Sequence, residues 1–293
     1  MAYRPTNPTT RSRLVWFDRS GKQTPAAPVE EYGNFSLSPD DRHIAFDRGD
    51  PPEIYLRELE TGGESKFTIN NPLEEAMQAW WPDGGSILFR TTNRLYRRAL
   101  GAGSKEEPPL VEDVGGGNLS PDGRYLVYLR GNDLWVKPLM GEGPSFPLME
   151  TPFSEYGFVS PNSQYIAIVS DQSGPGRWQI YIQSFPKAGR MRPVTTAGGI
   201  APVWRQDGNE LYYIAPDGNL MSVSIRETAS GLDIGKPERL FQPRILGGGT
   251  LLLGRGPQYR VTKDGRFLVN VAAEGPTSAP ITVILNWSAR LKK

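Results

Sequence analysis

Short apolar runs separated by polar turns recur along the whole chain. The runs are rich in β-branched and aromatic residues, a composition typical of β-strands. Most of them are apolar on both faces, which indicates strands that are covered on both sides. Six such runs each follow a polar turn directly. They span residues 43–46, 86–89, 125–128, 165–168, 210–213 and 267–270.

A short phrase, which reads Ser-Pro-Asp-Gly at 120–123, recurs in similar form before each of these runs. Proline sets φ for the first turn position, aspartate bonds to its own backbone, and glycine accepts a positive φ. The phrase therefore predicts a tight hairpin turn between two strands. Its third position falls at residues 40, 83, 122, 162, 207 and 264, so the steps are 39 to 45 residues except for a last one of 57.

A third strand with an apolar, aromatic, apolar pattern follows each of these two-stranded hairpins, for example at 54–56, 134–136 and 180–182. A polar fourth strand then leads to the next unit. Buried strands first and a polar strand last describe one blade of a β-propeller, whose outer edge lies in water. A period near forty residues is the spacing of such units. The sequence thus predicts an all-β fold, a single β-propeller domain over residues 1–293.

The number of blades depends on how the two ends of the chain are assigned. Residues 2–4 and 14–17 match second and third strands, so we predict seven blades, of which the first lacks its inner strand. Six blades, closed by residues 14–17 as an outer strand, is the alternative. The long last step indicates an inserted loop at 242–256. The expected blades span approximately 2–27, 33–70, 77–112, 116–150, 156–196, 201–242 and 257–287.

Composition excludes several classes of partner and chemistry. Lys and Arg number 33 against 32 Asp and Glu, so the chain gives no electrostatic reason to bind nucleic acid or an anionic membrane. The absence of cysteine excludes disulfides, thiol catalysis and thiolate zinc sites. The longest apolar runs have about five residues, whereas a membrane-spanning helix needs roughly 20. We therefore expect no membrane insertion by this chain.

The turn phrase, the apolar strand after it and the Ile-Tyr-Leu type of third strand resemble the TolB-like, WD-related propeller repeat. The ends, at 2–5, 14–22 and 280–287, resemble the propeller that lies C-terminal to bacterial serine/threonine kinases. The resemblance implies a sensing or binding domain in the periplasm, behind a kinase domain and a membrane helix. Residues 1–5 lack the pattern of a signal peptide. Either a cytoplasmic protein or a piece of a longer chain is expected, and the compartment stays open.

The sequence gives little support for catalysis. A serine hydrolase needs a histidine base, and the single histidine, His43, directly follows a blade turn, where a polar strand residue is expected. There is no Gly-x-Ser-x-Gly elbow. We predict that the protein is not an enzyme and has no cofactor or metal. The alternative is a lactonase-like, metal-dependent hydrolase whose carboxylates meet at the channel mouth; its candidate acids are Glu31, Glu75, Asp113 and Glu155.

The segments that enter the inner strands and the loops that join second to third strands cluster on one face of a propeller, around its axial channel. Such a face suits a protein or peptide ligand, and the resemblance implies the same use. The predicted function is therefore a non-catalytic module that binds a protein, a peptide or a small envelope ligand, as the sensor part of a kinase-like receptor. The candidate binding residues are Tyr32, Asn34, Gln78, Asn118, Tyr156 and Gln258 in the entering segments, Trp80 and Trp204 on inner strands, and Arg48, Arg90 and Arg130 in the loops.

Overall fold

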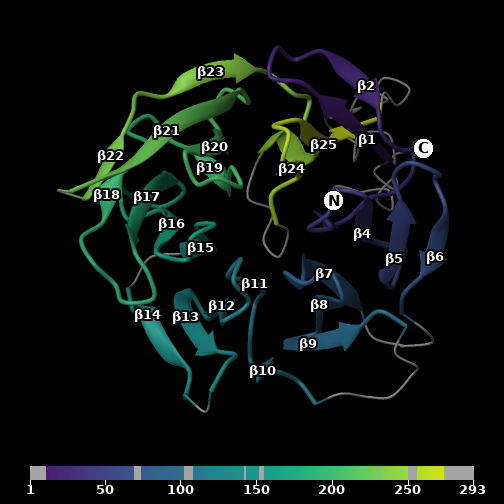
Figure 1. The fold of residues 1–293 in the computed structure, drawn as a ribbon, viewed down its shortest axis with the longest axis horizontal. Helices are drawn as coiled ribbons and strands as arrows, with labels where there is room; N and C mark the ends of the chain where they lie inside the picture. The colour runs from purple at the N-terminus through teal and green to yellow at the C-terminus, as the bar shows by residue number, and fades with distance from the viewer. Residues whose placement is uncertain are drawn as a thin grey trace, which may run out of the picture.

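Antiparallel sheets stand around a central axis in the computed structural model of the protein (Figure 1). The structure describes residues 11–68, 74–101, 108–141, 143–151, 155–229, 231–249 and 256–273. Within these residues the sheets number six, and each is one propeller blade. The all-β propeller prediction is confirmed. No helix in the described residues has the length and apolar character to cross a membrane.

Five blades are formed by consecutive strands that run from the axis outward in chain order. In blade 5 the strand β21 also pairs with a further outer strand, β23. Blade 1 contains β3 (Phe35–Leu37), β4 (His43–Arg48), β5 (Glu53–Glu58) and β6 (Glu64–Lys66), and blade 2 contains β7 (Glu75–Trp80), β8 (Ser86–Thr91), β9 (Arg94–Ala99) and β10 (Val111–Glu112). Blade 3 contains β11 (Gly117–Leu119), β12 (Tyr125–Arg130), β13 (Asp133–Pro138) and β14 (Phe146–Met149), and blade 4 contains β15 (Glu155–Val159), β16 (Tyr165–Ser170), β17 (Gln179–Ser184) and β18 (Arg192–Pro193). Blade 5 contains β19 (Ile200–Trp204), β20 (Glu210–Ile214), β21 (Leu220–Thr228), β22 (Gly231–Ile234) and β23 (Glu238–Phe241).

The closing blade joins the two ends of the chain. Its order from the axis is β24 (Tyr259–Val261), β25 (Phe267–Ala272), β1 (Ser12–Phe17) and β2 (Gln23–Pro25), seen in Figure 1 as yellow strands beside purple ones. β1 pairs with β25 over six residue pairs. The prediction of seven blades is wrong and the six-blade alternative is confirmed, because pairing with β25 satisfies backbone groups that an incomplete first blade would leave open.

Parts of the prediction lie outside the described residues, namely the strand expected at 2–4 and the part of the blade expected at 257–287 that follows residue 273. The insertion expected at 242–256 is described only in part. Its first half includes the 3-10 helix η1 (Leu246–Gly249) and lies against the closing blade, where Ile245 is buried and bridges to Val271.

Neighbouring blades bury their flat faces against each other, and this apolar burial is the main driving force of the fold. At the contact between blade 5 and the closing blade, the ring of Phe241 stacks on Phe17 with 5.0 Å between centroids. Phe241 also meets Phe267 edge-on at 5.6 Å. Strands β1 and β25 of the closing blade are thus held by side-chain packing against blade 5 as well as by their backbone pairing.

In all six repeated turns the backbone N–H of the fourth residue donates to the carbonyl of the first residue. In the turn at 120–123, Ser120 Oγ donates to Asp122 Oδ1 at 2.5 Å, and Asp122 Oδ1 accepts the backbone N–H of Arg124 at 3.0 Å. Burial raises the pKa of Asp122, but these hydrogen bonds outweigh it and leave that pKa lowered. The fourth turn position has a positive φ in every copy. The values are 61° at Asp41, 69° at Gly84, 70° at Gly123, 55° at Ser163, 75° at Gly208 and 83° at Gly265.

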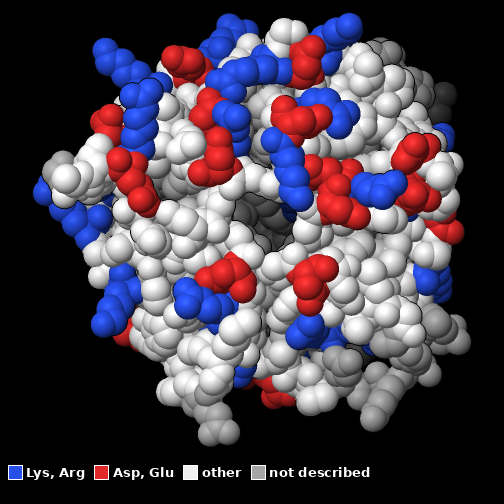
Figure 2. All heavy atoms as spheres, in the orientation of Figure 1, with Lys and Arg blue, Asp and Glu red and all other residues white. Residues whose placement is uncertain are grey.

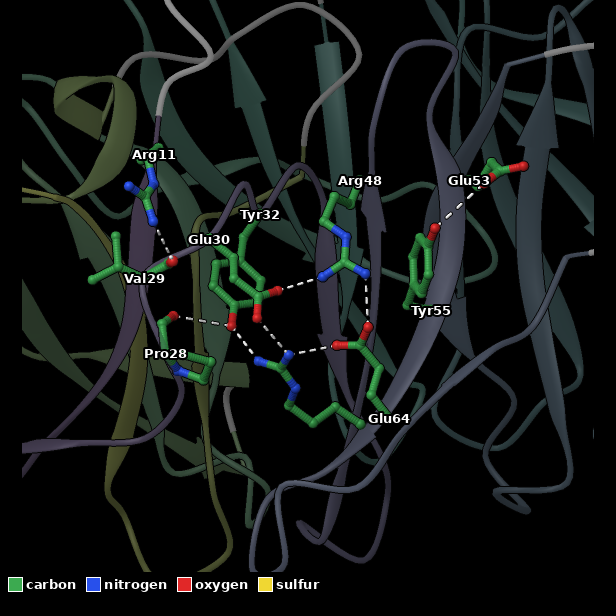
Figure 3. Close-up of polar contacts among 10 residues, drawn as sticks. Arg11, Pro28, Val29, Glu30, Tyr32, Arg48, Glu53, Tyr55 and Glu64 are labelled. Carbon is green, nitrogen blue, oxygen red and sulfur yellow. Dashed lines mark hydrogen bonds and ion pairs between the residues drawn. The ribbon is translucent and has the colours of Figure 1, made fainter.

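Two ion-pair clusters attach the N-terminal strands to the blades on either side. Toward blade 1, Glu30 pairs with Arg48 and Arg57, and Glu64 pairs with the same two arginines (Figure 3). Toward blade 5, Arg19 in the β1–β2 hairpin donates to both carboxylate oxygens of Glu210, at 3.0 and 2.7 Å. Charged pairs with two parallel hydrogen bonds are among the stronger polar contacts in proteins.

Glu210 makes the attachment to blade 5 dependent on pH. Burial raises its pKa, but hydrogen bonds from Arg19, Tyr212, Ser222 and Arg205 outweigh that effect and lower the pKa to about 2. The folded state therefore favours the ionised carboxylate, so its contribution is complete above the unfolded pKa of about 4.5 and is lost as the pH falls toward 2.

We expect Glu210→Gln to lower the free energy of unfolding by about 1–3 kcal/mol at pH 7. The difference from the wild type should shrink steadily between about pH 5 and pH 2, because the carboxylate takes up its proton near pH 4.5 in the unfolded state and only near pH 2 in the folded state. Urea unfolding followed by tryptophan fluorescence at several pH values measures it. Glu60→Gln is the control, since the Glu60 side chain is 81% exposed. A difference in the free energy of unfolding that does not change with pH would contradict the lowered pKa of Glu210.

Candidate functional site

The inner strands of all six blades line one cavity of about 570 Å³ on the propeller axis. Figure 2 shows the corresponding hollow at the centre of one face, with basic and acidic side chains mixed around it. Most of the wall is apolar or aromatic, with contributions from Phe35, Trp80, Phe158 and Trp204. A concave, largely apolar site with few polar groups is the usual form of a ligand pocket.

The repeated turns form one end of this cavity. The second residue of every turn lines it, and in four turns that residue is a proline. The last turn is joined to the first, because the backbone N–H of Lys263 donates to Asp41 Oδ2 at 2.9 Å. The turns thus surround a common axis, as a propeller requires. The six residues are Pro39, Pro82, Pro121, Pro161, Gln206 and Lys263.

The two tryptophans predicted for the channel both line it, and both connect neighbouring blades. Trp80 Nε1 donates to the carbonyl of Ser36 at 3.0 Å, and Trp204 Nε1 donates to the carbonyl of Phe158 at 2.9 Å. Each indole therefore ties its own inner strand to the inner strand of the preceding blade. The N–H groups are satisfied within the protein, so the rings offer a ligand their apolar surface.

Three predicted amides, Asn34, Gln78 and Asn118, also line the cavity. Gln78 Oε1 accepts the backbone N–H of Gly117 at 3.0 Å, a contact between blades 2 and 3. Asn118 Oδ1 accepts the N–H of the next residue, Leu119, at 2.9 Å. Gln78 thus braces the inner ring, a role that the sequence pattern did not indicate, whereas the hydrogen bond of Asn118 lies within its own strand.

Asp47 is the centre of the bracing around Asn34. It is 5% exposed and accepts the backbone N–H of Asn34 and that of Met77, both at 2.9 Å, so it connects blades 1 and 2. It also accepts Asn34 Nδ2 at 2.9 Å. A Cβ at Gly33 would lie 1.7 Å from Asp47 Oδ1, which explains the glycine. Sequence reasoning missed Asp47, because it lies inside a strand that reads as apolar.

A smaller pocket of about 100 Å³ adjoins the channel and shares Gln78, Asn118 and Phe158 with it. Gly115, Gly116 and the predicted Tyr156 line it as well. Tyr156 meets Trp178 at 6.1 Å between ring centroids, and burial raises the pKa of its hydroxyl. The structure thus brings six predicted residues to the channel and its side pocket: Asn34, Gln78, Trp80, Asn118, Tyr156 and Trp204.

Two other candidates are core residues. Tyr32 is 1% exposed and packs on Phe46 at 5.0 Å, and burial raises its pKa to about 12. Its hydroxyl accepts a hydrogen bond from Arg57 at 2.5 Å. Gln258 is 6% exposed and accepts Asn270 Nδ2 at 2.8 Å. Both side chains are therefore buried and lie outside the lining of the channel and its side pocket, and a binding role for them stays a prediction.

The three candidate arginines lie outside the channel lining. Arg48 belongs to the ion-pair cluster of blade 1 (Figure 3). Arg90 donates to the carbonyl of Thr92 in its own loop. Arg130 lies over the ring of Trp135, with 4.7 Å from Cζ to the centroid. These arginines therefore do not line the channel, and their role in binding stays a prediction.

Sequence reasoning also missed Arg260, which projects from β24 into the channel wall. It donates through Nη2 to the carbonyl of Phe35 at 2.6 Å, so it connects the closing blade to blade 1. Burial lowers its pKa to about 10, which leaves it protonated at neutral pH. No turn or repeat signal marks this position.

The acids proposed for an enzyme are dispersed in the described part of the chain, which contains no group of three or more His, Asp or Glu able to hold a metal. Glu75 is buried in β7, and Asp113 is exposed. Nothing is described of the Glu155 side chain. The acid of the channel lining is Asp41, already bonded to the turn of the closing blade.

Comparison with known proteins gives the fold. No family model and no curated protein matches the chain. A putative TolB from Agrobacterium tumefaciens is similar in structure, with a TM-score of 0.66 and 17% identity over 90% of this chain and 99% of that one. TolB from Acinetobacter baumannii has a TM-score of 0.57 at 19% identity over 79% of this chain and 66% of that one, under two thirds of its length. An oligogalacturonate lyase in complex with manganese has a TM-score of 0.55 at 14% identity over 89% and 96%.

These likenesses support a TolB-like propeller fold, and at such identities they carry no more than the fold. The resemblance of the chain ends to kinase-associated propellers stays a prediction.

We expect Asp47→Ala to lower the free energy of unfolding by about 2–4 kcal/mol, because it leaves the N–H groups of Asn34 and Met77 buried without this acceptor. Urea unfolding measures the loss. Asp233→Ala is the matched control, since Asp233 is exposed on the outer strand β22. Equal losses for the two variants would show that Asp47 does not brace blades 1 and 2.

Proposed function

We propose that the protein is a non-catalytic binding module that takes a segment of a partner polypeptide into its axial channel. The observation that carries the proposal is the continuity of the 570 Å³ channel with a 100 Å³ side pocket. A peptide can place its backbone along such a channel and one apolar side chain in such a pocket. Trp80, Trp204 and Tyr156 supply the aromatic surface that is favoured at binding hot spots.

The rigidity of the wall supports this role. The polar side chains of the inner ring already hold neighbouring strands in place, as Trp80 does with Ser36 and Gln78 with Gly117. A site whose wall is fixed before binding loses little conformational entropy when the ligand arrives. A binding module needs this property and no reactive group.

We further infer from the resemblance of residues 14–22 that this module is the periplasmic sensor part of a kinase-like receptor. The coding sequence around this chain tests the inference. A kinase domain and a spanning helix encoded in the same reading frame would support it, and a complete frame without them would overturn it.

The second candidate, a metal-dependent propeller enzyme, has one observation in its favour, the fold shared with an oligogalacturonate lyase crystallised with manganese. The acids nearest the channel have other partners, since Asp41 accepts the N–H of Lys263 and the turn acids accept backbone N–H groups. Calorimetric titration with Mn²⁺ or Ca²⁺ tests this candidate, and stoichiometric binding would favour it.

Selection from a random dodecapeptide library on the immobilised protein tests peptide binding. We expect enriched peptides to bind Tyr156→Ala at least tenfold more weakly, because the variant removes an aromatic wall of the side pocket. Tyr181→Ala is the control in the same blade, and its affinity should match the wild type, since Tyr181 lines neither cavity. Enrichment no greater than on the bare support, or equal binding by the two variants, would overturn the proposal.

A further inference from the structure

The guanidinium of Arg260 is held at the channel wall by neutral acceptors. Nη1 donates to the carbonyl of Tyr259 at 2.8 Å and to that of Pro257, and Nη2 donates to the carbonyl of Phe35 at 2.6 Å. Cζ lies 5.1 Å from the centroid of the Phe35 ring. These contacts fix the position of the charge but do not neutralise it.

Arg260 differs in this respect from Arg57, a buried arginine on the third strand of blade 1. Arg57 pairs with Glu30 and Glu64, whereas Arg260 has no carboxylate at ion-pair distance among the described residues. A charge removed from water is normally paired. Burial without a counter-ion is also the reason that the pKa of Arg260 is lowered to about 10.

The rest of the channel lining does not balance this charge. Its other charged residues, Lys263 and Asp41, have opposite signs and lie on turns that bond to each other. Among the described residues of the lining, Arg260 therefore carries a positive charge that no other residue balances. A ligand that complements this wall combines an anionic group with an apolar body.

The donors left over on Arg260 suit a carboxylate. A guanidinium has five N–H groups, and the three hydrogen bonds to carbonyls leave the Nε–H and one Nη2–H. This pair forms one edge of the planar fork that binds both oxygens of a carboxylate.

We propose that the channel selects an acidic segment of its partner polypeptide, whose carboxylate bonds to the free edge of Arg260 while an adjacent apolar side chain packs on Trp80 or Trp204. This inference rests on the proposed function, because it names the chemistry of the peptide that the channel takes. It gives a role to the donors of Arg260 that its hydrogen bonds to the three carbonyls leave free.

A pair of small probes tests the selection directly. N-acetyl-leucine and N-acetyl-leucinamide have the same apolar body and differ in the carboxylate. Each is titrated into the ¹⁵N-labelled protein at pH 7 and constant salt. The reporters are the Nε–H signal of Arg260 and the indole N–H signals of Trp80 and Trp204, all of which belong to groups at the cavity. We expect the acid to shift these signals and to bind at least tenfold more tightly than the amide.

Variants of Arg260 complete the experiment. Arg260→Gln should abolish the preference for the acid, and Arg260→Lys, which keeps the charge but not the fork, should reduce it severalfold. If Arg260→Gln does not fold because the bond to Phe35 is lost, Arg260→Lys tests the proposal, and an unchanged preference for the acid in that variant would contradict it. Arg266→Gln is the control, since Arg266 is a surface arginine of the same blade that pairs with Asp264; it should keep the full preference.

The outcomes separate this inference from the proposed function. Equal binding of acid and amide, with shifts at both tryptophans, would overturn the selection by Arg260 and leave peptide binding intact. A preference that persists in Arg260→Gln would also overturn it. If neither probe shifts the reporters, the carboxylate site does not exist, and the library selection then decides alone whether the channel binds peptides.

Discussion

The pairing of β1 with β25 is the contact on which the rest of the structure depends. Six residue pairs, from Ser12–Ala272 to Phe17–Phe267, turn a row of blades into a closed ring. Closure brings β24 beside β3, and this is why Arg260 can reach the carbonyl of Phe35 and Lys263 can reach Asp41. The axial channel is a consequence of the closed ring.

The repeated turn has two functions in this architecture. Its third residue accepts backbone N–H groups and so fixes the hairpin, as Asp122 does with Arg124. Its second residue points to the axis and forms one end of the channel. Because both functions recur once in each blade, the turn is read easily in the sequence and carries no information about a particular ligand. Specificity must come from positions that differ between blades.

Arginine shows how such differences arise. Arg57 and Arg260 are both removed from much of the solvent and both lie at a seam between blades, yet Arg57 is enclosed by two glutamates and Arg260 by carbonyl groups. In the first arrangement the glutamates neutralise the charge of Arg57, and the ion pairs strengthen the attachment of the N-terminal strands. The second leaves donors toward the channel, where a ligand can meet them.

The sequence by itself determined the propeller, its turns and most inner strands, because these depend on local patterns: alternating strands, turn residues and a period near forty. It also placed Trp80, Trp204 and Gln78 correctly at the channel, since inner strands must surround the axis. The tertiary structure decided the number of blades, because closure pairs residues that are 250 to 260 positions apart. It also decided that Tyr32 and Gln258 are buried and that Arg260 faces the channel. Those outcomes depend on the neighbour that each side chain meets across a seam, which no local pattern encodes.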